Sequence, residues 1–113
     1  MDRPRMHELV VGSEDLIPLV DLDRYAAVLD EALRAAGVGS VGVRAGMPEP
    51  DEWGLRTTIR VAVSDLEGGV RVLRRTLRSA GVPDATWIWQ WEPELVTYEI
   101  WGFSDDAPPS WGW

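Results

Sequence analysis

The chain has no cysteine and no lysine, and its single histidine is His7. Without cysteine, disulfides, thiolate nucleophiles and sulfur-ligated metals are excluded. No apolar run approaches the roughly 20 residues that a membrane-spanning helix needs. No apolar stretch typical of a secretory signal precedes Glu14 and Asp15 either. We therefore expect a cytoplasmic location.

The chain is acidic, and its basic residues are of a single type. Nineteen acidic residues face eleven basic ones, for a net charge of −8, and every basic residue is arginine. An acidic chain is repelled by nucleic acid and by anionic membranes and is attracted to basic partners. All-arginine usage is typical of a GC-rich bacterial genome. We expect a bacterial protein whose partner is a basic protein, with no nucleic acid and no membrane as partner.

Two segments have the apolar spacing of amphipathic helices. The first begins at Asp21 or Asp23 and ends at Gly37, and the second begins near Asp65 and ends at Gly81. Acidic residues at the start and glycine at the end are typical helix boundaries. At an offset of 44 residues the two segments share nine identities in eighteen aligned positions. This similarity predicts two copies of one unit.

Strand-like stretches flank both helices. The clearest is 57–64, where Ile59, Val61 and Val63 alternate with more polar residues. The other predicted strands are 8–13, 38–44 with Val41 and Val43 on one face, 86–92 and, more weakly, 97–101. Residues 46–54 contain prolines and acids and are typical of a mobile loop.

The predicted order is strand, helix, strand, strand, helix, strand, with a further strand as an option. Two such right-handed units interleave into one antiparallel sheet with both helices on one face. We therefore predict an α+β fold of the ferredoxin-like split βαβ type. The domain spans 1–103, and 104–113 form an irregular tail. A mostly parallel sheet is the alternative, which the short central connection disfavours.

Tryptophan is abundant, with seven residues in 113. Trp87, Trp89 and Trp91 alternate with other residues, so their indoles project from one face of a strand. They either pack under the helices or lie on the open sheet face as a binding surface, and we slightly favour the open face. In a third arrangement, the tail residues Trp111 and Trp113 cover them. The full set of aromatic candidates for partner binding is Trp53, Trp87, Trp89, Trp91 and Trp101.

The second predicted helix carries a stripe of arginines. After Arg71, further arginines follow at distances of three, four and seven residues, namely Arg74, Arg75 and Arg78. The four side chains therefore share one side of the helix. Such a stripe is usually a solvated face, and a bridge to the acids of the first helix is an option, since Asp30 and Glu31 stand at the positions that match Arg74 and Arg75. The alternative is a docking surface for an acidic partner, including a second copy of the chain.

Acidic residues gather outside that helix. Those near the tryptophan strand, Glu92 and Glu94 among them, describe a surface suited to a basic and partly apolar partner. The simpler interpretation is solubility. The acids concerned are Glu49, Asp51, Glu52, Glu92, Glu94, Glu99, Asp105 and Asp106.

The motifs of common enzymes are missing. No glycine pattern matches a phosphate loop, and Glu67-Gly68-Gly69 alone is weak evidence for anion binding. Asp21 with Asp23 has too few ligands for a calcium loop. We assign no catalytic residue, no metal site and no cofactor, and we consider an enzyme less probable than a binding protein. His7 is expected to lie at a strand end.

The string from Asp65 to Pro83, followed by Glu92-Pro93, resembles a group of small, uncharacterised bacterial proteins of ferredoxin-like type. The resemblance covers roughly residues 20 to 100. In size and charge the chain is similar to immunity proteins that neutralise polymorphic toxins. The resemblance implies a protein partner and carries no catalytic residues.

Three functions follow from these patterns. The first is an acidic protein-binding module, in its most specific form an immunity protein for a basic toxin. The second is a ferredoxin-like dimer that encloses a small-molecule or enzymatic pocket lined by the tryptophans. The third is a structural homodimer, held by paired tryptophan faces or by arginines against acids.

Overall fold

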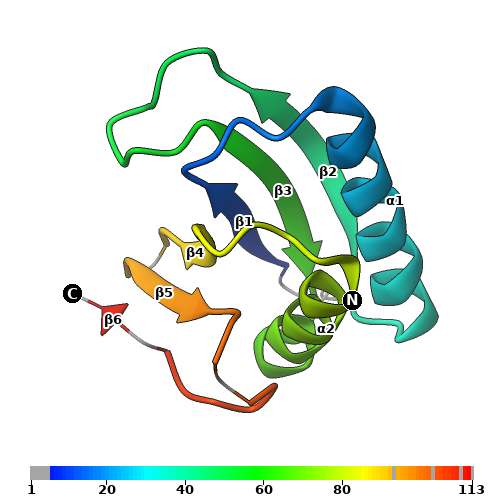
Figure 1. Cartoon of the computed structure of the whole chain (residues 1–113). Coiled ribbons are helices and arrows are strands. Elements are labelled where there is room, and N and C mark those ends of the chain that lie inside the picture. The colour runs from blue at the N-terminus through cyan, green and yellow to red at the C-terminus, as the bar shows by residue number, and fades with distance from the viewer. Residues whose placement is uncertain (1–5, 93, 103, 110, 113) are drawn as a thin grey trace.

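A computed structural model describes residues 6–92, 94–102, 104–109 and 111–112. Two helices and six strands alternate in the order strand, helix, strand, strand, helix, and then three strands (Figure 1). The elements are β1 (His7–Ser13), α1 (Leu19–Ala35), β2 (Gly39–Gly46), β3 (Thr57–Val63), α2 (Leu66–Ala80), β4 (Thr86–Gln90), β5 (Val96–Glu99) and β6 (Trp111–Gly112). In the described part of the chain, neither helix is long and apolar enough to cross a bilayer.

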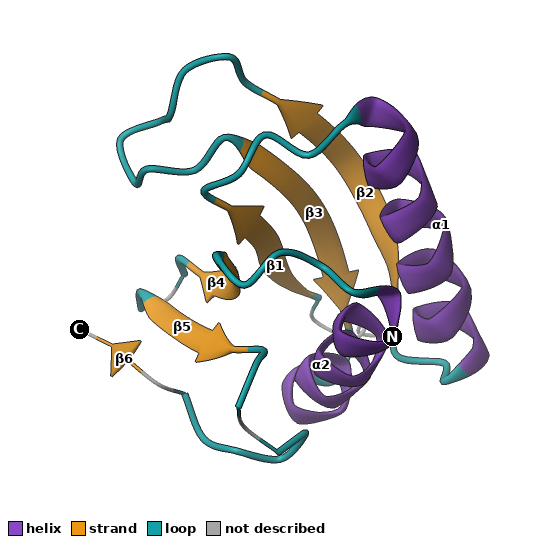
Figure 2. Cartoon of the chain, viewed as in Figure 1, coloured by secondary structure: helices purple, strands orange, loops and turns teal. Residues whose placement is uncertain are grey.

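The strands form one sheet in the order β2-β3-β1-β4-β5-β6. Every neighbouring pair is antiparallel. β3 lies between β1 and β2, so the first strand–helix–strand unit is split by a strand of the second. Both helices cover the same face of the sheet (Figure 2). The ferredoxin-like prediction is confirmed, and the mostly parallel alternative is wrong.

The helix boundaries follow local backbone chemistry. α2 begins after Asp65 and ends at Gly81, which adopts the left-handed conformation with φ +75° that glycine tolerates best. α1 begins at Leu19, two residues before the predicted Asp21. The reason is Pro18, whose carbonyl oxygen accepts a hydrogen bond from the Leu22 amide at 2.9 Å and starts the helical ladder.

The core lies between the helices and one sheet face. Alternate residues of β1 and β3 point into it and meet the leucines of both helices. Gly69 brings α2 close to the sheet, because a Cβ at this position would lie 2.7 Å from Val63 Cγ1. The buried side chains of this layer include Leu9, Val11, Leu29, Leu33, Ile59, Val61, Val63, Leu73, Leu77, Ile88 and Ile100.

One strand prediction is wrong. Val41 and Val43 do not share a face, because the register of β2 against β3 shifts between Val41 and Arg44. Val41 packs at the edge of the core, whereas Val43 is 70% exposed. After this bulge Arg44 lies on the helix side, where its Nε donates to Asp23 Oδ1 at 2.7 Å. A bulge inserts one unpaired residue and so exchanges the two faces of a strand beyond it.

The tail departs from the expected irregular course. The backbone of Trp111–Gly112 pairs with β5, with Thr97 opposite Trp111. The tail therefore extends the sheet at its edge. The proposed lid of tail indoles depended on Trp113, which lies outside the described residues, as does the side chain of Trp111.

Candidate functional site

β4 places its residues on two opposite faces of the sheet. Ile88 is fully buried in the core under the helices. Trp87 and Trp89 alternate with it and pair across the sheet with Gly12 and Val10 of β1. Trp91 follows the end of the strand. The three half-buried indoles lie on the face away from the helices, which the sequence analysis favoured.

The loop between β2 and β3 adds a fourth indole to this face. Its Trp53 ring lies 6.1 Å from the Trp89 ring and 6.4 Å from the Trp91 ring, between centroids. Trp89 and Trp91 stack at 5.7 Å with an interplanar angle of 16°. Trp87 meets Trp89 edge to face at 6.5 Å. We call Trp53, Trp87, Trp89 and Trp91 the tryptophan cluster.

Hydrogen bonds hold this loop in place, where the sequence predicted a mobile one. Asp51 Oδ1 accepts from the backbone amides of Trp53 and Leu55, both at 2.9 Å. The amide of Arg56 donates to the carbonyl oxygen of Ser13 in β1 at 2.8 Å. An aspartate that caps its own following residues is a typical turn-forming device. The loop is therefore folded onto the sheet and presents Trp53 in a defined position.

Leu55 anchors the loop on the open face. It is fully buried, although it lies outside the core beneath the helices. Gly12 makes the room, since a Cβ there would lie 2.6 Å from Leu55 Cδ1 and 3.1 Å from Trp89 Nε1. Leu55, Val10 and the indoles thus form a second, small apolar layer. This layer was not predicted from the sequence, because Leu55 and Gly12 stand in no periodic pattern that marks them as neighbours.

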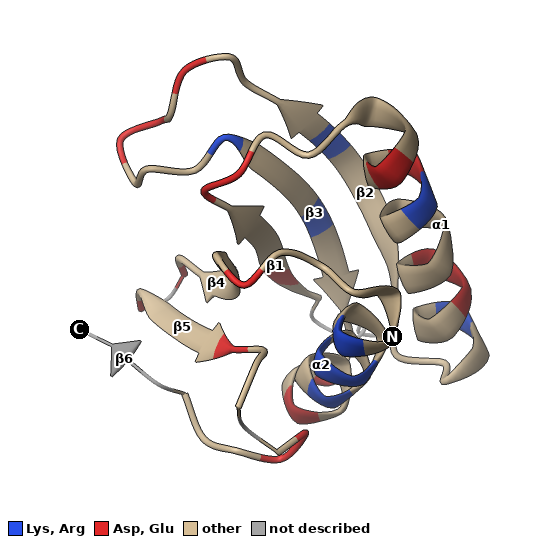
Figure 3. Ribbon diagram, viewed as in Figure 1, with Lys and Arg blue, Asp and Glu red and all other residues tan. Residues whose placement is uncertain are grey.

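A groove of about 550 Å³ opens beside the tryptophan cluster. Its apolar walls include Val43, Met47, Trp53 and Trp91, and the carboxylates of Asp51 and Glu52 lie on its rim. Arg60 also lines it, but its Nη1 donates to Glu8 Oε1. Figure 3 shows the acidic residues of this loop at the end of the molecule opposite the arginines of α2. The groove is therefore apolar, aromatic and acidic, and we call it the open-face groove.

Two indole N–H groups in the cluster make no hydrogen bond within the described residues. Nε1 of Trp89 and Nε1 of Trp91 are both buried without a partner. A buried tryptophan N–H usually finds an acceptor, and leaving it unpaired costs about 1–3 kcal/mol. The cluster therefore keeps donor capacity that the described residues do not use.

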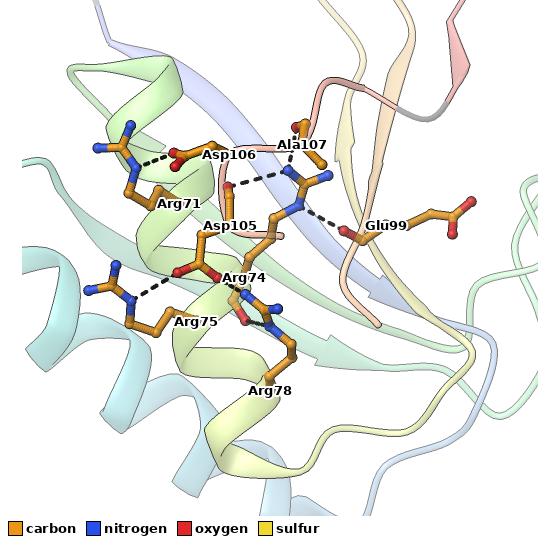
Figure 4. A network of polar contacts seen from close by, with 8 residues as sticks. All are labelled: Arg71, Arg74, Arg75, Arg78, Glu99, Asp105, Asp106 and Ala107. Carbon is orange, nitrogen blue, oxygen red and sulfur yellow. Dashed lines mark hydrogen bonds and ion pairs between the residues drawn. The ribbon is translucent and has the colours of Figure 1, made fainter. Parts of the chain in front are cut away.

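The arginine stripe lies on the other side of the molecule and is engaged by the tail. Arg74 is fully buried, and its guanidinium donates to the carbonyl oxygens of Glu99, at 2.8 Å, and of Asp105 and Ala107 (Figure 4). It lies 5.6 Å from the ring centre of Tyr98. Burial lowers the pKa of Arg74 and raises the pKa of Tyr98. Arg74 is thus unable to reach a partner, which corrects its assignment as a binding residue.

The other three arginines pair with the two tail aspartates. Arg71 binds Asp106, a hydrogen bond that raises the pKa of Arg71, while Arg75 and Arg78 both bind the carboxylate of Asp105. Asp30 of α1 accepts from Arg34 and from the amide of Val41, and these contacts lower the pKa of Asp30.

The remaining candidates lie apart from the groove lining. Trp101 is 37% exposed in the turn after β5, and Glu92 and Glu94 are exposed between β4 and β5. His7 is half-buried at the start of β1, as expected for a strand end. Within the described residues, no group of three or more histidine or acidic side chains is placed to hold a metal ion.

Comparisons with protein-family models, with curated proteins and with solved structures find no match to this chain. The candidate site is therefore defined by its own geometry.

Proposed function

We propose that this chain is a protein-binding module that uses the open-face groove to hold a basic, partly apolar segment of another protein. The observation that carries the proposal is the groove itself. Four indoles gather on a sheet face that no helix covers, beside the carboxylates of Asp51 and Glu52. Aromatic side chains in a partly open pocket are typical anchors of protein interfaces.

Charge supports the choice of partner. The chain carries a net charge of −8, and the arginines of α2 are paired with the tail. A basic partner is attracted over a distance by such a field and associates faster at low ionic strength. The apolar walls then supply the area that is buried on contact.

In its narrower form the proposal is that of a cytoplasmic immunity protein for a basic toxin. Its small size, its acidity and a ferredoxin-like fold support this form. The acidic rim would complement a cationic cleft of the toxin, and the indoles would enter it as anchors.

A photocrosslinking experiment tests the site in the native cell. The crosslinker p-benzoylphenylalanine replaces Val43 in the groove or, as a control of similar exposure, Val20 at the start of α1; these residues are 70% and 76% exposed. We expect one basic protein to crosslink from position 43 and not from position 20. The crosslink should disappear when Trp53→Ala is added. No crosslink from position 43, or equal crosslinks from both positions, contradicts the proposal.

A small-molecule site is the second candidate. The groove volume of about 550 Å³ lies in the range of ligand pockets. A dimer that pairs the open faces would enclose this volume. Light scattering tests this candidate, because the enclosed pocket requires a dimer, and a monomer in solution contradicts it.

A further inference from the structure

We propose that the end of the open-face groove that is lined by Trp53 and Trp91 is a subsite for one arginine side chain of the partner. This inference rests on the proposed function and specifies the group that the groove recognises. Two indoles and two carboxylates line the same groove, and the subsite needs both kinds of group.

The indoles present two faces at an angle. The rings of Trp53 and Trp91 are 6.4 Å apart between centroids and tilted by 46°, so they contact each other, and a cation would lie against their accessible surface rather than between them. Trp53 is 41% exposed, so part of its surface is accessible to a ligand in the groove. A cation within about 6 Å of an indole face is attracted by the negative charge density of the ring, and tryptophan is the best of the aromatic residues for this contact.

The carboxylates supply the second contact. Asp51 and Glu52 precede Trp53 in the chain and line the groove with it. Asp51 accepts hydrogen bonds from the amides of Trp53 and Leu55 through Oδ1. The chain's own cation in the groove, Arg60, pairs with Glu8. The groove lining thus carries two carboxylates against one guanidinium that is paired with a carboxylate, and its net charge attracts a cation.

Arginine suits this combination better than lysine. Its planar guanidinium stacks on an aromatic face while its N–H groups donate to carboxylates, whereas an ammonium is a compact and strongly hydrated charge. The same pairing occurs elsewhere in this fold. Arg24 lies 4.8 Å from the ring centre of Tyr25 and pairs with Asp21.

Indole N–H signals in NMR spectra of tryptophan-labelled protein provide the test. The full chain is titrated with a short capped peptide that has arginine between two leucines. Matched peptides carry citrulline, the neutral isostere of arginine, or lysine. We expect the arginine peptide to shift the Trp53 and Trp91 signals but not that of Trp101. Citrulline should bind at least about fivefold more weakly, since it lacks the charge.

Variants separate the contacts. Trp53→Leu should abolish the shift of the Trp91 signal, and Trp101→Leu should not change it. Glu52→Gln should weaken binding about threefold, as expected for an exposed charge, while Glu31→Gln on α1 should leave it unchanged.

Three other outcomes overturn the inference, and a fourth overturns the proposed function. Equal binding of the citrulline peptide shows a merely apolar groove, and equal binding of the lysine peptide removes the assignment to arginine. If the arginine peptide leaves the indole signals unmoved while a crosslinked partner still binds through position 43, the subsite is wrong and the proposed function stands. If position 43 yields no crosslink but the arginine peptide binds, the proposed function fails instead.

Discussion

The arginine stripe of α2 and the tryptophan cluster of β4 are the two unusual surfaces of this chain, and each is covered by a segment distant in sequence. The tail pairs with the arginines through aspartates and carbonyl oxygens, although Nη2 of Arg74 is buried without a partner among the described residues. The loop between β2 and β3 covers the indoles only in part and leaves a groove. The arginines of a helix can thus be paired within the fold, while the tryptophans of a strand remain accessible to a partner.

The two covers also differ in physical character. The tail is held by charged and polar contacts, most of them at the surface, around one buried guanidinium. The loop is held by a buried leucine and by an aspartate that caps its own turn. Salt weakens exposed ion pairs, whereas apolar burial does not depend on charge in this way. The two regions therefore respond differently to mutation and to ionic strength.

The largest expected effect is at the anchor of the open face. Leu55→Ala removes a fully buried side chain and should lower the free energy of unfolding by about 3 kcal/mol, measured by urea denaturation. The loop should also release Trp53, so partner binding weakens. Leu16→Ala, at a residue that is 46% exposed, is the control and should cost less than about 1 kcal/mol. Equal losses in both variants would show that Leu55 is no anchor.

The next effect is at the centre of the arginine stripe. Arg74→Gln leaves buried carbonyl oxygens without their charged donor and should cost about 2 kcal/mol in the same assay. The control Arg75→Gln removes an arginine whose side chain is 67% exposed, and should cost under about 1 kcal/mol. If both variants are equally stable, the buried guanidinium is not what holds the tail.

The smallest effect concerns the ion pairs of the tail. Asp105→Asn removes the carboxylate shared by Arg75 and Arg78 and should cost about 1 kcal/mol at low salt. The difference in the free energy of unfolding between Asp105→Asn and the unmodified protein should shrink at high salt, because salt screens these ion pairs in the unmodified protein. Urea denaturation at two salt concentrations measures both values. A loss that is independent of salt contradicts an electrostatic role for Asp105, and Leu55→Ala provides the salt-independent reference.

Much of the fold was predictable from local patterns. The three- and four-residue spacing of apolar residues and the terminal glycines placed both helices. The alternation about Ile88 put Trp87, Trp89 and Trp91 on one common face, with the open face slightly favoured. The bulge in β2 was not predictable, because Val41 and Val43 fit a regular strand equally well. Their separation depends on the register against β3, which is a property of the paired strands.

The site was predictable only in part. Trp53 was a candidate by composition, but its position against Trp89 depends on the turn capped by Asp51 and on the space above Gly12. The sequence Asp51-Glu52-Trp53-Gly54-Leu55 carries a signal for that turn, namely an aspartate two residues before its first amide donor. The distance of the arginines from the tail aspartates along the chain left their pairing open.

The sequence by itself determined the two helices, the main strands and the split βαβ order, because these depend on periodicity and on short-range backbone preferences. It placed Trp87, Trp89 and Trp91 on one face of their strand and only slightly favoured the open side of the sheet for them. The tertiary structure decided that the arginines of α2 pair with the tail and that the apolar groove beside the tryptophan cluster stays accessible. That decision requires segments some 30 residues apart to meet, and their contacts are set by packing over the whole domain, which local spacing does not specify.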